Sequence, residues 1–242
     1  MIIHHCSSVC EKESRLNYFI VGDIHGCYHT FMELFNKHWS PENQTLVQVG
    51  DMIDRGNFRA KVLNAVRDLE TKHPEAVISL MGNHETELIE HLKAQTNPFW
   101  LAQGGITTVN DMKREITDID ELLSWLKARP MFYETDHIFV SHAGISKTTN
   151  DPFDYDSCNG VLWTREPLKD LGKTQVVGHT PTHDGKPRFD PSSNTWYIDT
   201  WAYHGKGLCG AIFNEQGQMI EWHVEPTSAL DIDFQPGLRR TV

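Results

Sequence analysis

The sequence of 242 residues has few cysteines, a deficit of positive charge and no long apolar run, and each shortage excludes a class of protein. Five scattered cysteines, an odd number, are too few for a disulfide framework and are typical of reduced thiols inside a cell. No run of about 18 apolar residues occurs, so no transmembrane helix is predicted. Lysine and arginine number 22 against 33 aspartates and glutamates, a net charge of −11, which argues against non-specific nucleic-acid binding.

Residues 1–17 are predicted to form a polar N-terminal segment, because they hold no apolar stretch of signal-peptide length. The histidines and cysteines between His4 and Cys10 resemble a metal-binding tract, but a polar terminus favours no specific site. Residues 18–242 are expected to form a single domain, since no break in composition divides them and they are numerous enough for a full core. We therefore expect a cytoplasmic protein with no membrane partner.

Short apolar runs of strand length alternate with amphipathic helical patterns along the first half of the chain, which predicts an α/β layered fold. The predicted strands are 18–21, 46–49, 76–80, 137–140, 175–177, 195–198, 209–213 and 219–222. The predicted helices are 28–35, 59–72, 85–95 and 121–129. The last 50 or so residues show strands with little helical pattern, which indicates antiparallel pairing. Residues from about 97 to 130 separate two strands and are expected to form a cap-like insertion.

Five of the predicted strands each end in a glycine-flanked polar cluster. The clusters are Gly22-Asp23-Ile24-His25-Gly26, Gly50-Asp51-Met52-Ile53-Asp54-Arg55-Gly56, Gly82-Asn83-His84-Glu85, Ser141-His142-Ala143-Gly144 and Gly178-His179-Thr180-Pro181. Ligands of α/β sheets bind outside the carboxyl ends of the strands, so five such clusters can converge on one site.

Carboxylate, imidazole and amide side chains of the kind that these clusters deliver are ligands of first-row divalent metals such as manganese, iron or zinc. The six candidate ligands are Asp23, His25, Asp51, Asn83, His142 and His179. Six are too many for one metal with an open position, and they suit two metals about 3.5–4 Å apart that share a carboxylate. Turn formation also places Asp and Asn beside glycine, but five such clusters in one chain disfavour that interpretation.

These five clusters, in this order, resemble those of the PPP-type metallophosphoesterases, a family with a calcineurin-like fold. The family includes serine/threonine protein phosphatases and symmetrical diadenosine tetraphosphate hydrolases, and the likeness runs from Gly22 to roughly Thr200. It implies a central β-sandwich or pair of sheets flanked by helices, with a short helical cap over the metal cleft. It also implies two divalent metal ions, with manganese as the first choice and iron or zinc as alternatives.

The resemblance implies a division of the ligands between the two metals. Asp23 and His25 hold the first metal, and Asp51 bridges both. The remaining ligands complete the second site: Asn83, His142 and His179.

The resemblance also implies which residues act on the substrate. His84 is the general acid that protonates the leaving oxygen, and Asp54 holds its imidazole charged and oriented. Arg55 and Arg165 bind the substrate phosphate, together with Asn83, because guanidinium groups can donate bidentate hydrogen bonds to phosphate oxygens.

The reaction implied is hydrolysis of phosphoserine or phosphothreonine monoesters in proteins, with phosphotyrosine as an extension, by direct attack of metal-bound hydroxide. The alternative is a symmetrical dinucleoside tetraphosphate (Ap4A) hydrolase with the same metal core, because the cap and loops choose the substrate. A nuclease fits poorly with the acidic balance, and a non-catalytic binding protein fits poorly with a complete set of ligands. We expect a phosphoprotein or phosphopeptide partner, leave the oligomeric state open, and leave open whether His183 and His204 face the cleft.

Overall fold

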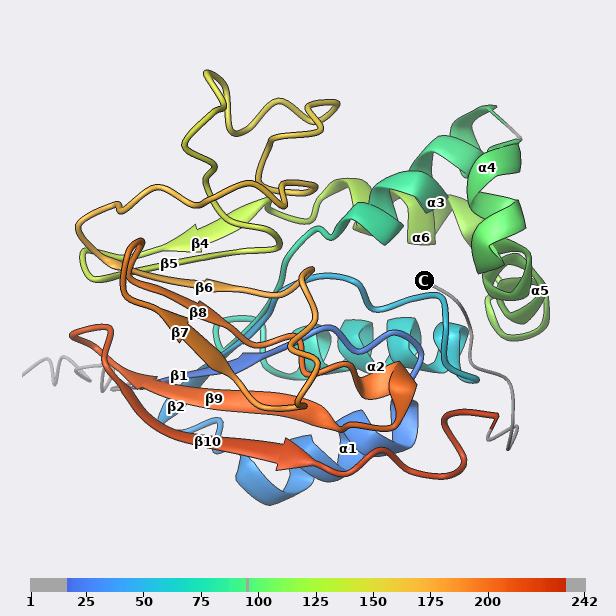
Figure 1. The fold of residues 1–242 in the computed structure, drawn as a ribbon. Helices are drawn as coiled ribbons and strands as arrows, with labels where there is room; N and C mark the ends of the chain where they lie inside the picture. Colours follow the sequence, from blue (N-terminus) through green and yellow to red (C-terminus); the bar gives the residue numbers. More distant parts are fainter. Residues whose placement is uncertain (1–16, 95, 234–242) are drawn as a thin grey trace, which may run out of the picture.

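The computed structural model describes residues 17–94 and 96–233, so the predicted histidine and cysteine tract between His4 and Cys10 lies outside the described residues. Two five-stranded sheets pack face to face, one with the order β10-β9-β1-β2-β3 and the other with the order β4-β5-β6-β8-β7 (Figure 1). Helices flank this sandwich, which confirms the predicted α/β fold class. Within the described residues, no helix combines the length and apolar character that crossing a membrane requires.

The first sheet joins the beginning of the described chain to its end. Its strands are β1 (Asn17–Val21), β2 (Gln44–Gln48), β3 (Val77–Ser79), β9 (Leu208–Asn214) and β10 (Met219–Glu225). The strands β1, β2 and β3 are parallel, whereas β9 pairs antiparallel with both β1 and β10. The antiparallel pairing expected for the last strands is therefore confirmed for β9 and β10.

The second sheet has three parallel strands in its middle and a short antiparallel strand at each edge. Its strands are β4 (Phe132–Glu134), β5 (Ile138–Ser141), β6 (Thr174–Val177), β7 (Arg188–Asp190) and β8 (Thr195–Tyr197). The strand β8 runs parallel to β6 and antiparallel to β7, so the antiparallel expectation holds for one of its two neighbours. The edge strands β4 and β7 have three residues each and are largely exposed, so no apolar run predicted them.

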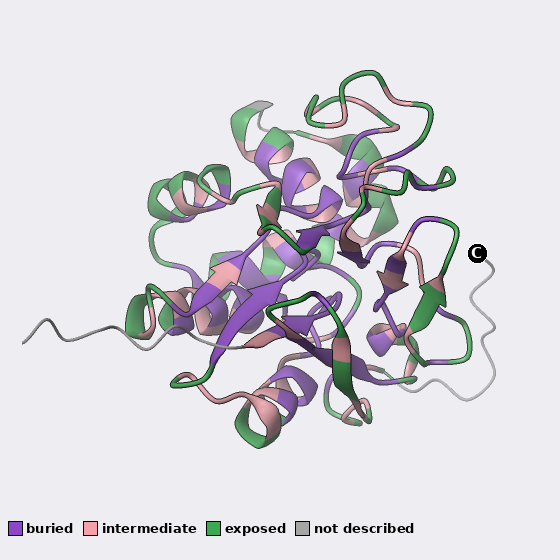
Figure 2. Cartoon of the chain, turned by 90° about the vertical axis from the view of Figure 1, so that its left-hand side faces the viewer, coloured by how far each residue is buried: buried purple, intermediate pink, exposed green. Residues whose placement is uncertain are grey.

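Apolar side chains from both sheets fill the interior of the sandwich. Ile20 and Val47 come from the first sheet and Val140 and Val176 from the second, and all four are fully buried in one cluster. Each such side chain contributes about 1.5–3 kcal/mol by leaving water. Figure 2 shows this buried interior between exposed outer helix faces. The continuous apolar runs of these strands are thus explained by packing on both faces.

Two helices cover the outer face of the first sheet. The helices α1 (Tyr28–His38) and α2 (Arg59–Lys72) bury Leu34 and Leu63, respectively, in the cluster that contains Phe19 of β1. The bounds of α2 match the predicted 59–72. Since α1 follows β1 and α2 follows β2, each helix begins just after the loop that carries a polar cluster.

The predicted cap-like stretch is helical and gathers at one end of the sandwich (Figure 1). The helix α3 (Asn83–Ala94) is followed by α4 (Pro98–Trp100), η1 (Leu101–Gly105), α5 (Ile106–Glu115) and α6 (Ile119–Lys127). Gly104 interrupts the helical backbone with a φ of 122°, which favours glycine because no Cβ is present. The chain therefore turns at Gly104, and α5 comes back toward the start of α2. A short helix, η2 (Ala202–His204), precedes β9.

The start of α1 is held by a residue from the far end of the chain. No hydrogen bond from its own N-cap side chain, that of Cys27, caps α1. Instead the fully buried carboxylate of Asp231 accepts hydrogen bonds from the backbone N–H groups of His29 (3.0 Å) and Thr30 (2.7 Å). The carbonyl of Asp231 also accepts a hydrogen bond from the N–H of Asn57 at 2.7 Å. Asp231 thereby ties the start of α1 to the loop after β2.

Replacing Asp231 by Ala should lower the free energy of unfolding by about 2 kcal/mol, because buried helix-end N–H groups lose their acceptor. The measurement is urea unfolding followed by tryptophan fluorescence. Asp233→Ala is the matched control, since this exposed residue makes one bond, to the Asn57 side chain at 3.2 Å; its effect should stay within about 0.5 kcal/mol. Equal effects of the two substitutions would contradict the assigned capping role.

Candidate metal centre

The loops after β1, β2, β3, β5 and β6 meet at one end of the sandwich and bring the predicted polar clusters together. Parallel strands direct their carboxyl ends to the same edge of a sheet, so the loops that follow them are neighbours. Contacts link the clusters directly: the Asp23 carboxylate accepts the backbone N–H of His179 at 3.0 Å, and His142 Nε2 lies 2.9 Å from Asn83 Oδ1. The five clusters therefore form one site, as their positions in the sequence predict.

Two of the predicted ligands, His142 and His179, have fixed tautomers. His142 Nδ1 lies 3.0 Å from the carbonyl oxygen of Val49, and His179 Nε2 lies 3.1 Å from that of Trp163. A carbonyl oxygen only accepts hydrogen bonds, so these two ring nitrogens donate. The opposite nitrogens, Nε2 of His142 and Nδ1 of His179, then carry lone pairs.

These two lone pairs face each other and two oxygen atoms. His142 Nε2 and His179 Nδ1 are 3.1 Å apart. Asn83 Oδ1 lies 2.9 Å and 3.0 Å from them, and Asp51 Oδ2 lies 3.4 Å from His142 Nε2. Nitrogen lone pairs at this distance repel each other unless a cation lies between them. The four side chains thus have the chemistry and the arrangement of a metal site.

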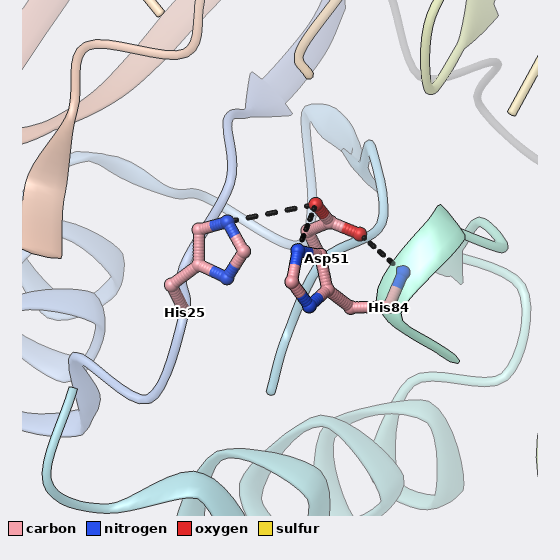
Figure 3. Close-up of side chains that lie close together, drawn as sticks. All are labelled: His25, Asp51 and His84. Atoms are coloured by element: carbon pink, nitrogen blue, oxygen red, sulfur yellow. Dashed lines mark hydrogen bonds and ion pairs between the residues drawn. The ribbon is translucent and has the colours of Figure 1, made fainter. Parts of the chain in front are cut away.

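The same oxygen of Asp51 also lies near a ring nitrogen of His25. Nδ1 of His25 donates to the carbonyl of Ile53 at 2.8 Å, so its Nε2 carries the lone pair. That nitrogen lies 3.5 Å from Asp51 Oδ2, as Figure 3 shows. Potential ligand atoms accordingly fall into two groups that share Asp51: one with His142 and His179, the other with His25 and His84.

Asp23, also a predicted ligand, is buried in the centre but belongs to neither group of ligand atoms. Its carboxylate is directed instead to the backbone N–H of His179. A Cβ at Gly178 would lie 1.9 Å from Oδ1 of Asp23, so only glycine allows the loop after β6 to approach this carboxylate so closely. Asp23 thus joins the loop after β1 to the loop after β6.

Besides Asp54, which is paired with His84, four buried carboxylates concentrate negative charge in this centre. They are Asp23, Asp51, Glu85 and Asp199. Burial together with the charges of Asp199 and Asp51 raises the pKa of Asp23 well above its ordinary value, and burial together with Asp51 raises the pKa of Glu85 to about 7. Within residues 17–94 and 96–233, no lysine or arginine forms an ion pair with any of the four. Divalent cations would relieve this repulsion, so the residues present fit a metal centre.

The predicted ligands and the predicted acid differ in the pKa of their imidazoles. Burial lowers the pKa of His25 to about 4 and that of His179 well below the ordinary value, so both rings are neutral and able to bind metal. Burial also lowers the pKa of His84, but the carboxylates of Asp51 and Asp54 outweigh it and raise the pKa to about 9. His84 is thus the protonated imidazole of the three.

His84 stands in the first turn of α3 and faces both of these carboxylates. Its Nδ1 donates to Asp54 Oδ2 at 2.5 Å, and its Nε2 lies 3.8 Å from Asp51 Oδ2. Its backbone N–H donates to Asp51 Oδ1 at 3.1 Å (Figure 3). The Nδ1 side of the ring is therefore fixed by Asp54, and the Nε2–H proton is directed toward the metal ligands, where a substrate oxygen would lie.

The two predicted phosphate-binding arginines, Arg55 and Arg165, are exposed residues on loops next to this buried centre. The Arg55 guanidinium lies 5.6 Å from the ring centroid of Tyr203, whose ring in turn packs edge-on against His25 at 4.9 Å. Arg165 is close enough for its charge to add to the effect of burial on the low pKa of His179. Both cations are thus near the ligands and open to solvent.

The two histidines left open by the sequence, His183 and His204, pack against Trp201. The ring centroids lie 4.6 Å and 4.1 Å from that of the indole, and neither histidine belongs to the two groups of ligand atoms.

Glu85 is a residue of the centre whose role sequence reasoning missed, although its motif was recognised. One of its carboxylate oxygens accepts the backbone N–H groups of Asp51 (2.8 Å) and Gly82 (3.1 Å), and the other accepts that of Met52 (2.8 Å). Asp51 has a left-handed backbone, with a φ of 56°, which costs a non-glycine residue about 1–2 kcal/mol. Glu85 therefore holds the strained loop that orients the shared carboxylate.

Comparison with known proteins gives one family match and several named relatives. The family described as calcineurin-like phosphoesterase matches residues 16–204. Serine/threonine-protein phosphatase 2 of Salmonella typhimurium is 32% identical over 165 residues, which cover 65% of this chain and 71% of that protein. Serine/threonine-protein phosphatase 1 of the same organism is 27% identical, with coverage of 82% and 92%.

Other matches are named for a different substrate, a dinucleoside tetraphosphate. A symmetrical bis(5'-nucleosyl)-tetraphosphatase of Erwinia tasmaniensis is 31% identical over 133 residues, which cover 53% of this chain and 44% of that protein. The crystal structure of a proposed diadenosine tetraphosphatase has a TM-score of 0.62 at 19% identity and covers 89% of this chain and 96% of that one. At this low sequence identity, the structural similarity shows a shared fold alone.

Replacing Glu85 by Gln should weaken manganese binding about 10- to 100-fold, because an amide N–H would face backbone N–H groups that need an acceptor. The measurement is calorimetric titration of chelator-stripped protein with Mn²⁺, with circular dichroism to establish that the variant is folded. Glu90→Gln, at an exposed position of the same helix, is the control and should bind as the unmodified protein does. A folded Glu85→Gln variant with unchanged affinity would show that Glu85 does not hold the loop as described.

Proposed function

The chain belongs to the calcineurin-like phosphoesterase family, and on this basis we propose that it is a phosphoprotein phosphatase of the serine/threonine type. Membership confirms the resemblance inferred from the strand-end motifs and makes the protein a metal-dependent phosphoesterase. The observation that carries the proposal is the position of Asp51 between two groups of ligand atoms, with the His84–Asp54 pair beside it. That arrangement supports two divalent ions that share one carboxylate, next to a proton donor.

Each ligand has a defined part in holding the ions. His25 would hold the first ion and Asp51 would hold both, and Asp23, the other ligand implied for the first ion, accepts the backbone N–H of His179 in this structure. The ligands of the second ion are Asn83, His142 and His179. When bound, the two ions, manganese first and iron or zinc as alternatives, supply an activated water and charge for the phosphate oxygens. In the neutral rings, the hydrogen bond from one nitrogen to a carbonyl oxygen leaves the lone pair on the other nitrogen, the one assigned as ligand.

His84 serves as the acid of the reaction. Its Nε2–H gives its proton to the ester oxygen as the bond to phosphorus breaks, which avoids release of a basic alkoxide. Asp54 keeps the ring oriented through Nδ1 and stabilises its positive charge. Arg55 and Arg165, both exposed, bind the remaining phosphate oxygens, with Asn83 at the floor of the site.

The extent of similarity favours a phosphoprotein over a dinucleoside polyphosphate as substrate. The curated phosphatase relatives are covered over 71% and 92% of their own lengths, whereas the symmetrical tetraphosphatases of Erwinia tasmaniensis and Escherichia coli are covered over 44% and 62%. Substrate choice depends on cap and loops, so a relative that matches beyond the shared core is the better guide. A symmetrical tetraphosphatase activity with the same metal core is the alternative.

The proposed substrate class is tested by comparing a phosphoserine or phosphothreonine peptide with diadenosine tetraphosphate. With Mn²⁺ present, kcat/KM for the peptide should be at least about 10-fold higher, a difference of about 1.4 kcal/mol in transition-state binding. Chelator-treated protein without added metal is the control and should release no phosphate. A preference in the opposite direction would establish the tetraphosphatase alternative.

Replacing His84 by Asn should lower kcat about 10²- to 10⁴-fold with a phosphopeptide, because the leaving oxygen loses its proton donor. Mn²⁺ affinity, measured by calorimetry, should persist, since His84 is not assigned as a ligand. His137→Asn, at an exposed turn, is the control and should retain full activity. Loss of metal together with activity in His84→Asn would instead identify His84 as a ligand.

A further inference from the structure

We propose that Trp100 and Thr108, from the helical stretch that follows α3, are positioning residues for the His84 acid and act through Asp54. The proposal rests on the proposed phosphatase function, in which His84 donates the proton. It gives the cap-like insertion a part in the proton-transfer step, in addition to any part in choosing the substrate.

Asp54 is the centre of a small buried network. Its carboxylate, 1% exposed, accepts hydrogen bonds from three side chains. His84 Nδ1 and Trp100 Nε1 both donate to Oδ2, at 2.5 Å and 2.7 Å, and the Thr108 hydroxyl donates to Oδ1. Two of the three donors thus come from the insertion, more than 40 positions away from Asp54 in the sequence.

Both added donors are buried and fix both carboxylate oxygens. Trp100 is 1% exposed and Thr108 is fully buried, so neither bond competes with water. With His84 as its one partner, the Asp54 carboxylate would be free to rotate about its side-chain bonds and would carry the imidazole with it. Bonds to Oδ1 and Oδ2 from different helices remove that rotation, and a buried network of this kind is worth more than its separate bonds.

The double glycine of the insertion allows this contact. A Cβ at Gly105 would lie 2.3 Å from the Trp100 indole, so the backbone there can lie flat against the ring because Gly105 has no side chain. The turn at Gly104 brings α5 back so that Thr108 reaches Asp54. The Asn97 side chain also accepts the backbone N–H of Trp100 at 3.2 Å, which fixes the short helix α4.

A second contact anchors α5 to the loop that carries Asp54. The buried Arg59 donates from Nε to Asp111 of α5 at 2.6 Å, and it also donates to the carbonyl of Gly56, two residues after Asp54. The insertion and the loop after β2 are therefore held in a fixed position relative to each other. Independent hydrogen bonds and an ion pair thus converge on the same placement of Asp54.

The step affected is transfer of the His84 Nε2–H proton to the ester oxygen as its bond to phosphorus breaks. A weakly basic leaving group such as p-nitrophenolate departs without that proton, whereas the more basic phenolate needs it. Loss of positioning must therefore slow hydrolysis of phenyl phosphate more than that of p-nitrophenyl phosphate. A general loss of structure or of metal would slow both esters alike.

The test variants are Trp100→Phe, which removes the indole N–H and keeps an aromatic ring, and Thr108→Val, which replaces the hydroxyl with a methyl group of similar size. Each should lower kcat with phenyl phosphate about 10-fold and with p-nitrophenyl phosphate less than about 2-fold. Trp125→Phe is the matched control. Trp125 lies in the same insertion, and its indole N–H also donates to a carboxylate, that of Glu70 in α2, at 2.8 Å. The control should not change the ratio of the two rates. Equal losses on both esters for the two test variants would overturn the proposal.

A readout independent of activity is the proton resonance of the His84 Nδ1–H in the magnetic resonance spectrum, identified by its absence in His84→Asn. Both test variants should shift this resonance, and Trp125→Phe should leave it in place. An unmoved resonance in both test variants would overturn the proposal. Should the unmodified protein hydrolyse neither ester, the proposed function fails, while the resonance still decides whether Trp100 and Thr108 act on His84.

Discussion

The buried charge of Asp51 is the constraint on which the rest of the structure depends. Its carboxylate lies among the imidazoles of His25, His84, His142 and His179, in a centre that also buries Asp23, Glu85 and Asp199. Protonation, which the raised pKa values of Asp23 and Glu85 favour, or bound cations relieve this concentration of negative charge, so metal binding and the fold are linked. Two kinds of hydrogen bond hold the metal-binding residues in place. Backbone N–H groups donate to the Glu85 carboxylate, and the ring nitrogen of His142 donates to a carbonyl oxygen.

The loops that present this centre are held in unfavourable backbone conformations. Five non-glycine residues of the site have a positive φ: His25, Asp51, Asp54, Arg55 and His179. At about 1–2 kcal/mol each, such conformations persist only where the surroundings dictate them. The apolar interior of the sandwich fixes the strand ends, and Asp231 fixes the start of α1 and the loop after β2 from outside. The rigid strands thus hold the strained loops in the conformations that the site requires.

The sequence predicts the parts of the site that carry local signals. The apolar runs and the glycine-flanked clusters both lie within a few residues, so the strand ends and the convergence of their polar side chains follow from them. The edge strands β4 and β7 have no such run, and the parallel pairing of β8 with β6 comes from tertiary packing that its own residues do not encode. Asp231, Trp100 and Thr108 act across large separations, so no spacing rule reveals them.

The contact between Asp231 and the start of α1 has a consequence for the order in which a nascent chain gains its structure. The first sheet needs β9 beside β1, and the start of α1 and the loop after β2 are clamped by a residue still further along. A ribosome-bound chain that has emerged through α6 carries Asp23, Asp51, Asn83 and His84, yet it has neither the strand nor the clamp that completes them. The metal centre therefore matures late in synthesis, after nearly the whole described chain has emerged.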